Sequence, residues 1–286
     1  MTAPLHLRID VCTHRALRDG VPGVLDILRR TGSRATFFVA FGPDASGLAM
    51  TKMLNPAFAW KMMRSNAAAT HGFATAFYGT LLPSPMIGSG LPELVRRIRD
   101  EGHEVGMHGW DHRRWQDGLR SFEPGRAARE FERMRAAFRA VLGAEPRSFA
   151  APAWLATHEI LASESGLEYA SDARGTEPFL PSFDGRDYGV PQLPVTLPTL
   201  DEQLGRLTPA QFTDEIVSLA AAQPGYCCFT AHAEAEGLAY AASFESILRR
   251  VDRPVRPLCE ATRSALPRRV MRFGRVPGRP SDVLML

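Results

Sequence analysis

The chain has 286 residues, of which 45% are hydrophobic and 23% charged, values typical of a globular protein with a sizeable core. Its formal net charge of +3 is too small to indicate a nucleic-acid-binding protein. The four cysteines form no CxxC pair and are too sparse for a disulfide scaffold, which favours a reducing compartment. The N-terminal residues lack a signal-peptide pattern, so export is not expected, and no uncharged apolar run reaches the roughly 20 residues of a membrane-spanning helix.

Strand-like and helix-like segments alternate along the chain. In the first half we expect a strand over 5–11, a helix over 21–30 ended by Gly32, a strand over 35–40, a helix over 92–99, a strand ending near Met107 and a helix over 125–142 stopped by Gly143. In the second half we expect short strands over 148–150, 168–171 and 192–195, a helix capped at Thr208, a strand over 226–231, a helix over 243–250 and a strand over 255–258. Repeated strand–helix units with apolar strands predict an α/β fold with a mostly parallel sheet, closed into a barrel.

One short motif, His108-Gly109-Trp110-Asp111-His112, points to a metal site, because two imidazoles four residues apart can bind one ion. The spacing alone is a weak signal, since histidines recur at this distance by chance. A zinc-protease helix would need Glu where Gly109 stands, so we expect a loop at a strand end instead.

The other polar candidates also follow expected strands. Asp10 and Cys12 end the first strand, Asp172 follows the strand over 168–171, and His232 follows the strand over 226–231. The carboxyl ends of parallel strands are where a β/α barrel assembles its active site, so these residues are expected to lie together with the two histidines.

Several ordered motifs make the chain similar to the polysaccharide deacetylase (NodB-homology) family, over about residues 5–258. They are 8–11, 20–22, 42–44, 60–62, 64–67, 103–106, 108–112, 171–172, 174–175, 194–199, 232–234 and 236–237. The resemblance is closest to the branch that deacylates amino sugars carried on undecaprenyl phosphate, the 4-deoxy-4-formamido-L-arabinose-phosphoundecaprenol deformylases of polymyxin resistance. It implies an irregular (β/α) barrel with an inserted apolar helical segment, and metal-assisted hydrolysis of an amide.

The resemblance also implies roles for individual residues. Asp10 corresponds to the base that deprotonates the metal-bound water, and His108 and His112 correspond to the histidine ligands. His232 resembles the acid that protonates the leaving amine, and Asp172 resembles the carboxylate that orients such a histidine, with a helix N-cap as its alternative.

Two positions depart from the family pattern. Cys12 stands where the family has a metal-binding aspartate, so it is either a thiolate ligand, a sign of an impaired site, or a small buried residue. A thiolate would favour zinc, with cobalt, manganese and nickel as alternatives. The segment 151–154 lacks the arginine that many deacetylases use to hold the base, and Arg174 is a candidate replacement.

The substrate class is suggested by an insert over about 42–90 that is rich in Met, Phe, Tyr and Trp. The insert has two possible interpretations. It forms either helices that pack on the barrel or an interfacial surface that admits a polyprenyl phosphate from the membrane. The candidate substrate- and lipid-binding residues are Trp60, Lys61, Arg64, Asn66, Trp110 and Trp154. We therefore expect peripheral association with the cytoplasmic face of the inner membrane.

The expected organisation is a deacylase domain over 1–262 followed by a basic tail over 263–286, solvated and flexible unless it meets anionic headgroups. The predicted function is removal of a formyl or acetyl group from an amino sugar linked to undecaprenyl phosphate, for modification of lipid A. Two alternatives stay open: a soluble deacetylase of polysaccharide or peptidoglycan, and a relative with a weakened site that binds the lipid-linked sugar. The sequence does not indicate an oligomeric state.

Overall fold

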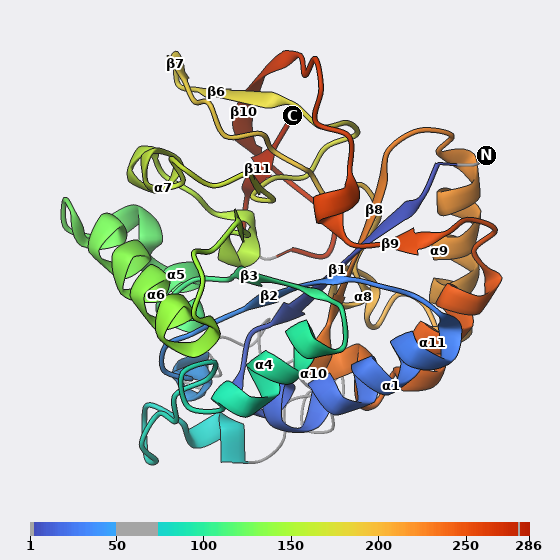
Figure 1. Ribbon diagram of the computed structural model, residues 1–286, viewed down its shortest axis with the longest axis horizontal. Coiled ribbons are helices and arrows are strands. Elements are labelled where there is room, and N and C mark those ends of the chain that lie inside the picture. Colours follow the sequence, from blue (N-terminus) through green and yellow to red (C-terminus); the bar gives the residue numbers. More distant parts are fainter. Residues whose placement is uncertain (1–2, 50–73, 280) are drawn as a thin grey trace.

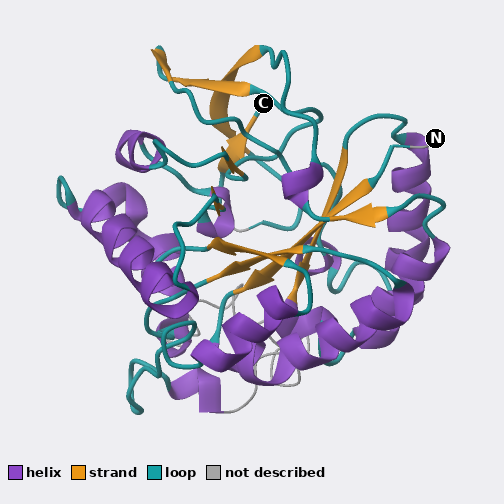
Figure 2. Ribbon diagram, in the orientation of Figure 1, coloured by secondary structure: helices purple, strands orange, loops and turns teal. Residues whose placement is uncertain are grey.

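The computed structural model describes residues 3–49, 74–279 and 281–286, and its largest element is a curved sheet of parallel strands (Figures 1 and 2). Along the sheet the order is β5 (Tyr169–Ala170), β4 (Ser148–Phe149), β3 (Glu104–Met107), β2 (Thr36–Val39), β1 (Leu5–Val11) and β8 (Cys227–His232), and β9 (Val255–Arg256) also pairs with β1. Strand β1 pairs with β2, β8 and β9, and all seven of its residues are buried. The α/β class and the irregular barrel expected from the sequence are thus confirmed.

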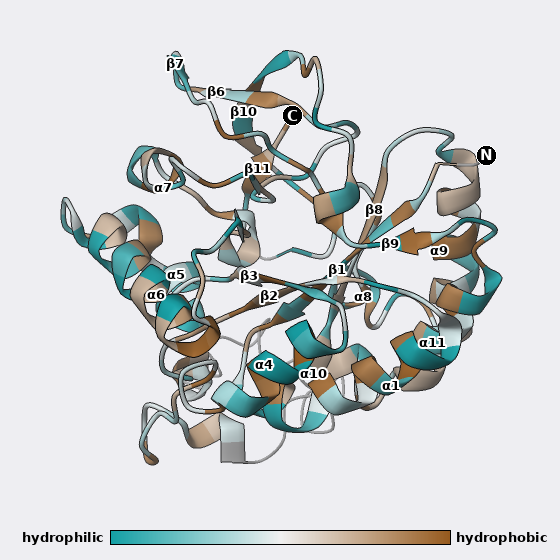
Figure 3. Cartoon of the chain, viewed as in Figure 1, coloured by the Kyte–Doolittle hydropathy of each residue, from teal (hydrophilic) through white to brown (hydrophobic). Residues whose placement is uncertain are grey.

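Helices cover the outer face of the sheet. The longer ones are α1 (Val21–Thr31), α4 (Pro92–Asp100), α6 (Arg126–Leu142), α9 (Pro209–Ala222) and α11 (Ala241–Arg250). The shorter ones are α5 (His112–Gly118), α7 (His158–Ser163), α8 (Leu200–Gln203) and α10 (Ala233–Glu236). Figure 3 shows hydrophobic stripes alternating with hydrophilic ones on α1 and α4, as expected for helices with one face on a core.

Local sequence explains where these helices begin and end. Helix α1 ends at Gly32, which has a left-handed φ of 63° and satisfies the last carbonyls. Helix α9 begins with a capping box, in which Thr208 and Gln211 each accept a hydrogen bond from the other's backbone amide. Both boundaries agree with the sequence-based expectation.

A second sheet lies on the far side of the main sheet from α1, α4 and α11 (Figure 1). Its order is β11 (Val283–Met285), β10 (Arg268–Gly274), β6 (Leu180–Phe183) and β7 (Arg186–Asp187). Strand β10 runs parallel to β6, and β11 returns antiparallel to β10. The expected flexible tail over 263–286 is therefore wrong for the described part of that segment, because β10 and β11 complete a sheet.

Some other expectations also need correction. Residues 192–195 form isolated bridges to Ala170, Arg174 and Phe179 in place of a strand. The strand expected over 255–258 is only the short β9, since Leu258–Glu260 turns into a 3-10 helix.

About half of the insert expected over 42–90, residues 50–73, lies outside the described residues. At its edges, Pro43 bridges to Met86, and Ala74–Phe77 forms a 3-10 helix. Within the described part of the chain, no helix is both long and apolar enough to cross a membrane.

Candidate active site

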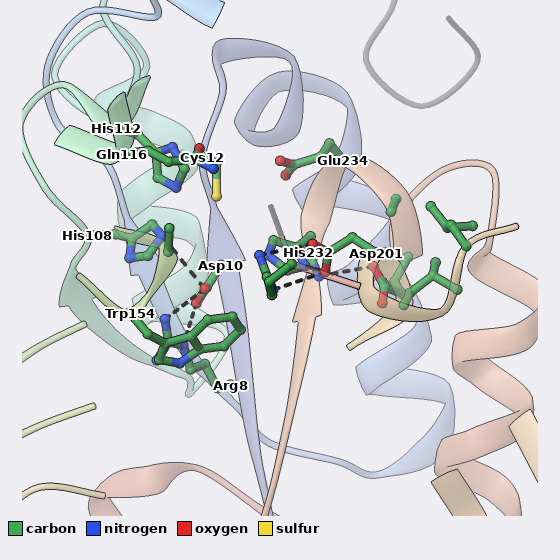
Figure 4. A pocket seen from close by; sticks show the side chains of 16 residues that line it. Arg8, Asp10, Cys12, His108, His112, Gln116, Trp154, Asp201, His232 and Glu234 are labelled. Atoms are coloured by element: carbon green, nitrogen blue, oxygen red, sulfur yellow. Dashed lines mark hydrogen bonds and ion pairs between the residues drawn. The ribbon is translucent and has the colours of Figure 1, made fainter. Parts of the chain in front are cut away.

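A cavity of about 210 Å³ opens at the carboxyl ends of the central strands. Its lining includes the strand-end candidates Asp10, Cys12, His108, His112 and His232. Figure 4 shows these side chains on two sides of one gap, with Cys12 and the two neighbouring histidines facing His232 and Glu234. The structure therefore brings together five of the residues that the sequence singled out.

Cys12, His108 and His112 form a cluster that could hold one metal ion. Their ligand atoms, the thiol sulfur and one nitrogen from each imidazole, all lie within 4.8 Å of one another. Three protein ligands with a further position open to solvent are typical of catalytic zinc sites. The donor set present therefore fits a divalent ion.

The protonation of these groups has a clear physical cause. Burial lowers the pKa of His108 to about 4, with Asp10 opposing the shift, and burial also places the pKa of His112 well below 6.5. Both imidazoles are thus neutral at physiological pH, which is the ligating form. Nδ1 of His108 lies 2.8 Å from the carbonyl oxygen of Ala150, so its Nε2 is left for the cavity. Burial raises the pKa of the Cys12 thiol well above its usual value, so the thiol is protonated without a metal. Binding of a metal by Cys12 would therefore release this proton, because the thiolate is the ligating form.

The turn between the two histidines depends on its own sequence. Gly109 has a φ of +77°, and a Cβ there would lie 2.8 Å from a side-chain carbon of Pro152. Both the left-handed backbone and the close contact therefore favour glycine at this position. Asp111 then caps α5 by accepting a hydrogen bond from the amide of Arg114 at 2.9 Å. The motif follows the end of β3, as expected, but His112 is the first residue of a helix and does not lie in a loop.

Asp10 is held by Arg8, which lies two residues earlier on the same face of β1. The guanidinium donates to both carboxylate oxygens, at 2.7 and 2.8 Å, and also to the backbone and hydroxyl oxygens of Ser171. Burial alone would raise the pKa of Asp10, but Arg8 and His108 outweigh it and hold that pKa well below its usual range. Asp10 is therefore a fixed carboxylate, and its Oδ2 lies 3.6 Å from Nε2 of His108.

His232 occupies the opposite wall. It ends β8, and the β1–β8 register places it beside Asp10. Burial alone would lower its pKa, but Asp201, Asp10, Glu234 and Glu236 outweigh burial and raise it. A protonated imidazole at this place can donate a proton to a bound substrate.

Two buried glutamates lie next to His232 on α10. Glu234 and Glu236 are 5% and 1% exposed, and Oε2 of the first and Oε1 of the second have no hydrogen-bond partner. Burial raises the pKa of each to about 7, with His232 opposing the shift. Both line the cavity, and Oε2 of Glu236 accepts a hydrogen bond from the amide of His232 at 3.0 Å.

Trp154 forms the cavity floor in a strained conformation. It and Ala153 have φ angles of 53° and 54°, a left-handed geometry that costs about 1–3 kcal/mol for a residue with a side chain. The indole ring is contacted by Arg8, Arg174 and Arg279, whose guanidinium carbons lie 5.8, 5.1 and 4.3 Å from its centre. The predicted role of Trp154 in substrate binding stays a prediction, and its position in the lining is compatible with it.

The structure corrects two of the expected roles. Asp172 is fully buried and accepts hydrogen bonds from the amide of Ala151 and the side chain of Gln192. The carboxylate beside His232 is that of Asp201, whose Oδ1 lies 3.9 Å from Nδ1 of His232. Arg174 pairs with Glu202 at 2.7 Å, whereas the arginine that holds Asp10 is Arg8.

Other candidates lie elsewhere. Trp110 packs over Gly42 and lines a second cavity with Pro43, outside the lining of the first. Trp60, Lys61, Arg64 and Asn66 lie outside the described residues.

The sequence interpretation missed Arg8, Asp201, Glu234 and Arg279. A signal existed for Arg8, because residues two apart on a strand share a face. None existed for Arg279, which reaches the cavity from 269 residues beyond Asp10 in the chain only through the second sheet.

Comparison with known proteins decides the family. The polysaccharide deacetylase family model matches residues 4–170. The chain belongs to this family. It is 37% identical over 246 residues to a Shewanella sediminis protein named "Probable 4-deoxy-4-formamido-L-arabinose-phosphoundecaprenol deformylase ArnD", covering 85% of this chain and 79% of that one. A protein of the same name from Wigglesworthia glossinidia brevipalpis is 30% identical, covering 80% of this chain and 81% of its own length.

Solved structures agree on the fold. A candidate polysaccharide deacetylase from Mycobacterium smegmatis superposes with a TM-score of 0.61 at 18% identity, covering 91% of this chain and 88% of the other. Peptidoglycan deacetylase PdaC from Bacillus subtilis gives a TM-score of 0.51 at 15% identity, covering 91% and 89%. Family membership makes this deacetylase relative an amide-bond hydrolase, as the sequence predicted.

Proposed function

We propose that the protein removes the formyl group from 4-deoxy-4-formamido-L-arabinose carried on undecaprenyl phosphate, in the modification of lipid A that gives polymyxin resistance. The observation that carries the chemistry is the pairing, across one cavity, of a metal-ligand cluster and fixed carboxylate with a histidine whose pKa is raised by the carboxylates around it. The substrate is supported by the names of the two relatives and their coverage of most of this chain.

The residues divide the work of hydrolysis between the two walls. When bound, a divalent ion held by Cys12, His108 and His112 would polarise the acyl carbonyl and acidify water. Asp10, kept ionised by Arg8, accepts a proton from the attacking water. Attack of the water oxygen forms the C–O bond at the carbonyl carbon. The C–N bond then breaks as His232 gives its proton to the departing nitrogen, so that a free amine leaves together with formic acid, which ionises to formate.

We propose zinc as the metal, because a soft thiolate in the ligand set favours it over ions that prefer oxygen. Support comes from the position of Cys12, whose sulfur shares the cluster with both imidazoles. The alternative, a weakened site that binds the sugar without turnover, predicts metal-free or inactive protein.

We also propose that the protein acts while peripherally bound to the membrane surface. Leu81 and Leu82 are 80% and 43% exposed, and they lie within the apolar insert over 42–90. Two adjacent exposed leucines in such a segment suit contact with the acyl boundary of a bilayer.

Mass spectrometry of undecaprenyl-phosphate sugars tests the function. The purified protein, with its metal content measured, is incubated separately with the formamido-arabinose and the acetamido-arabinose lipids and with an acetylated peptidoglycan fragment. We expect loss of the acyl group from the formamido lipid. Preferential reaction of the peptidoglycan fragment would support the soluble deacetylase instead, and no reaction with metal-loaded protein would support the non-catalytic relative.

A further inference from the structure

The C-terminal part of the chain contributes a side chain to the cavity. Arg279 lines it, on a turn between β10 and β11, and its side chain is only 10% exposed. Both flanking strands are anchored, β10 to β6, and β11 through hydrogen bonds that join Arg174 to Leu284 and Leu286. The turn is therefore held in place from both sides.

Gly278 permits the turn to come this close. Its φ is +86°, and a Cβ on it would lie 2.1 Å from the carbonyl oxygen of Glu202 on α8. Any other residue would push the turn away from α8 or strain the backbone. The contact between the turn and α8 is thus built into the sequence.

Arg279 uses its whole guanidinium at this contact. Its nitrogens lie 3.0 Å from Oδ2 and 3.2 Å from Oδ1 of Asp201, 3.0 Å from Oε1 of Glu202 and 3.2 Å from the hydroxyl of Thr199. Its plane also covers the indole of Trp154, at 4.3 Å. A planar guanidinium bonded to this many partners has a fixed orientation, so it also fixes the orientation of the Asp201 carboxylate that it binds.

The carboxylate it orients is the neighbour of the proton donor. Oδ1 of Asp201 accepts hydrogen bonds from the Thr199 hydroxyl at 2.6 Å and from Arg279, and lies 3.9 Å from Nδ1 of His232. The side chain of Asp201 is 42% exposed, so packing alone does not set its rotamer. Its direction toward His232 depends on these bonds.

We propose that Arg279 is a positioning residue for the reaction: it fixes Asp201 against His232, and Asp201 in turn keeps the imidazole aimed at the departing amine. The proposal rests on the proposed function only for the role of His232 as proton donor. It extends the active site to a segment that the sequence presented as a tail.

A direct test follows the imidazole of His232 by NMR titration in the full-length, zinc-loaded protein, which requires no turnover. Asp201→Asn should lower the pKa of His232, because the carboxylate is lost. Arg279→Gln should also lower it, because Asp201 turns away. A rise in Arg279→Gln would mean that Arg279 is only a nearby positive charge, and would overturn the proposal.

Kinetics supply the second arm. Arg279→Gln and Asp201→Asn should each reduce kcat by about 10- to 100-fold with KM little changed, since a misplaced proton donor weakens only the transition state. The double variant should lose no more than Asp201→Asn alone, because the arginine acts through Asp201. Additive losses would contradict the proposal.

Two further variants separate positioning from folding. Arg275→Gln removes the same charge from the same segment, but its side chain is 73% exposed and paired with Asp282, so kcat and the His232 titration should stay unchanged. Arg279→Lys keeps the charge without the fork, and should lie between the wild type and Arg279→Gln. If Arg279→Lys equals the wild type in both readouts, the fork is unnecessary and the proposal fails. An inactive wild type with the expected titrations would refute the proposed substrate and leave the positioning intact.

Discussion

His108 is buried at the site, so its replacement should have a direct effect on metal binding. It is 1% exposed, its Nδ1 is engaged by the carbonyl of Ala150, and its other nitrogen belongs to the ligand cluster. His108→Ala should abolish stoichiometric binding of the divalent ion and turnover, while the fold is retained. Metal analysis after gel filtration measures the first, with His158→Ala, a half-exposed histidine bonded to Tyr188, as the control. Stoichiometric metal in the His108 variant would remove the cluster from consideration as the metal site.

Cys12 sets the metal preference at the same scale. Cys12→Asp replaces a soft sulfur donor by an oxygen donor, so activity should be retained or raised and the preference should broaden from zinc toward cobalt and manganese. Activity of protein reconstituted with each metal in turn, together with binding constants measured by competition with a chelator, gives the comparison. Complete loss of activity with bound metal would show that the thiol has a separate role.

Glu164 predicts how stability depends on pH. It is fully buried, its Oε1 has no hydrogen-bond partner, and burial next to Asp172 raises its pKa well above the usual value. The folded state thus retains a proton that the unfolded chain releases above its ordinary pKa of about 4.5. This contribution to stability is full below that pH and declines as pH rises toward the folded-state pKa.

Glu164→Gln should therefore gain stability relative to the wild type as pH rises from 5 to 8, an interval of about three units over which denaturant midpoints can be compared. Glu132→Gln, on an exposed face of α6, is the control and should show a constant difference. A constant difference for Glu164→Gln as well would mean that Glu164 is already ionised in the folded protein.

At the scale of elements, the strands with strong periodic signals were predictable. Strand β1, helix α1 and helix α9 lie where apolar runs and caps placed them, because local sequence decides their ends. Strand β10 was not predictable from the sequence, because its first three residues are exposed and it is rich in arginine. It forms a strand through its pairing with β6.

The site divides in the same way. Strand-end residues such as His108 and His232 could be located because the ends of parallel strands meet. Asp201 and Arg279 could not, since the short α8 and the β10–β11 turn reach the cavity through tertiary contacts between distant segments. The pairing of Arg8 with Asp10 could have been predicted, because residues two apart on a strand share a face.

The loop after Ala74–Phe77 gives the membrane proposal a local test. The double substitution Leu81→Glu, Leu82→Glu places charge on the exposed leucines and should reduce co-sedimentation with anionic liposomes, because the apolar contact is lost. Turnover of the polyprenyl substrate should fall more than turnover of a short-chain analogue. Val270→Glu, at a 55% exposed valine on β10, is the matched control and should leave both unchanged. Equal co-sedimentation of the double variant and the wild type would argue against contact through this loop.

At the scale of the whole molecule, one active site is assembled from residues spread over nearly the entire chain. The proposed base comes from β1, the proposed ligands from the end of β1 and from the β3–α5 turn, the proposed acid from β8, and Arg279 from the second sheet. Cooperative folding of both sheets is consequently a condition for activity, and a change in the second sheet reaches the chemistry without touching the ligands.

The pairing of β1 with distant strands also has a kinetic consequence. This wholly buried strand is synthesised long before its neighbours β8 and β9, and His6 lies within hydrogen-bond distance of the carbonyl of Pro257, 251 positions later. Until β8 emerges from the ribosome, the edge of β1 that pairs with it has no hydrogen-bonding partner strand. An unpaired strand edge of this kind makes the nascent chain prone to aggregation. Refolding from denaturant should accordingly be slow and concentration-sensitive, with yield highest at high dilution.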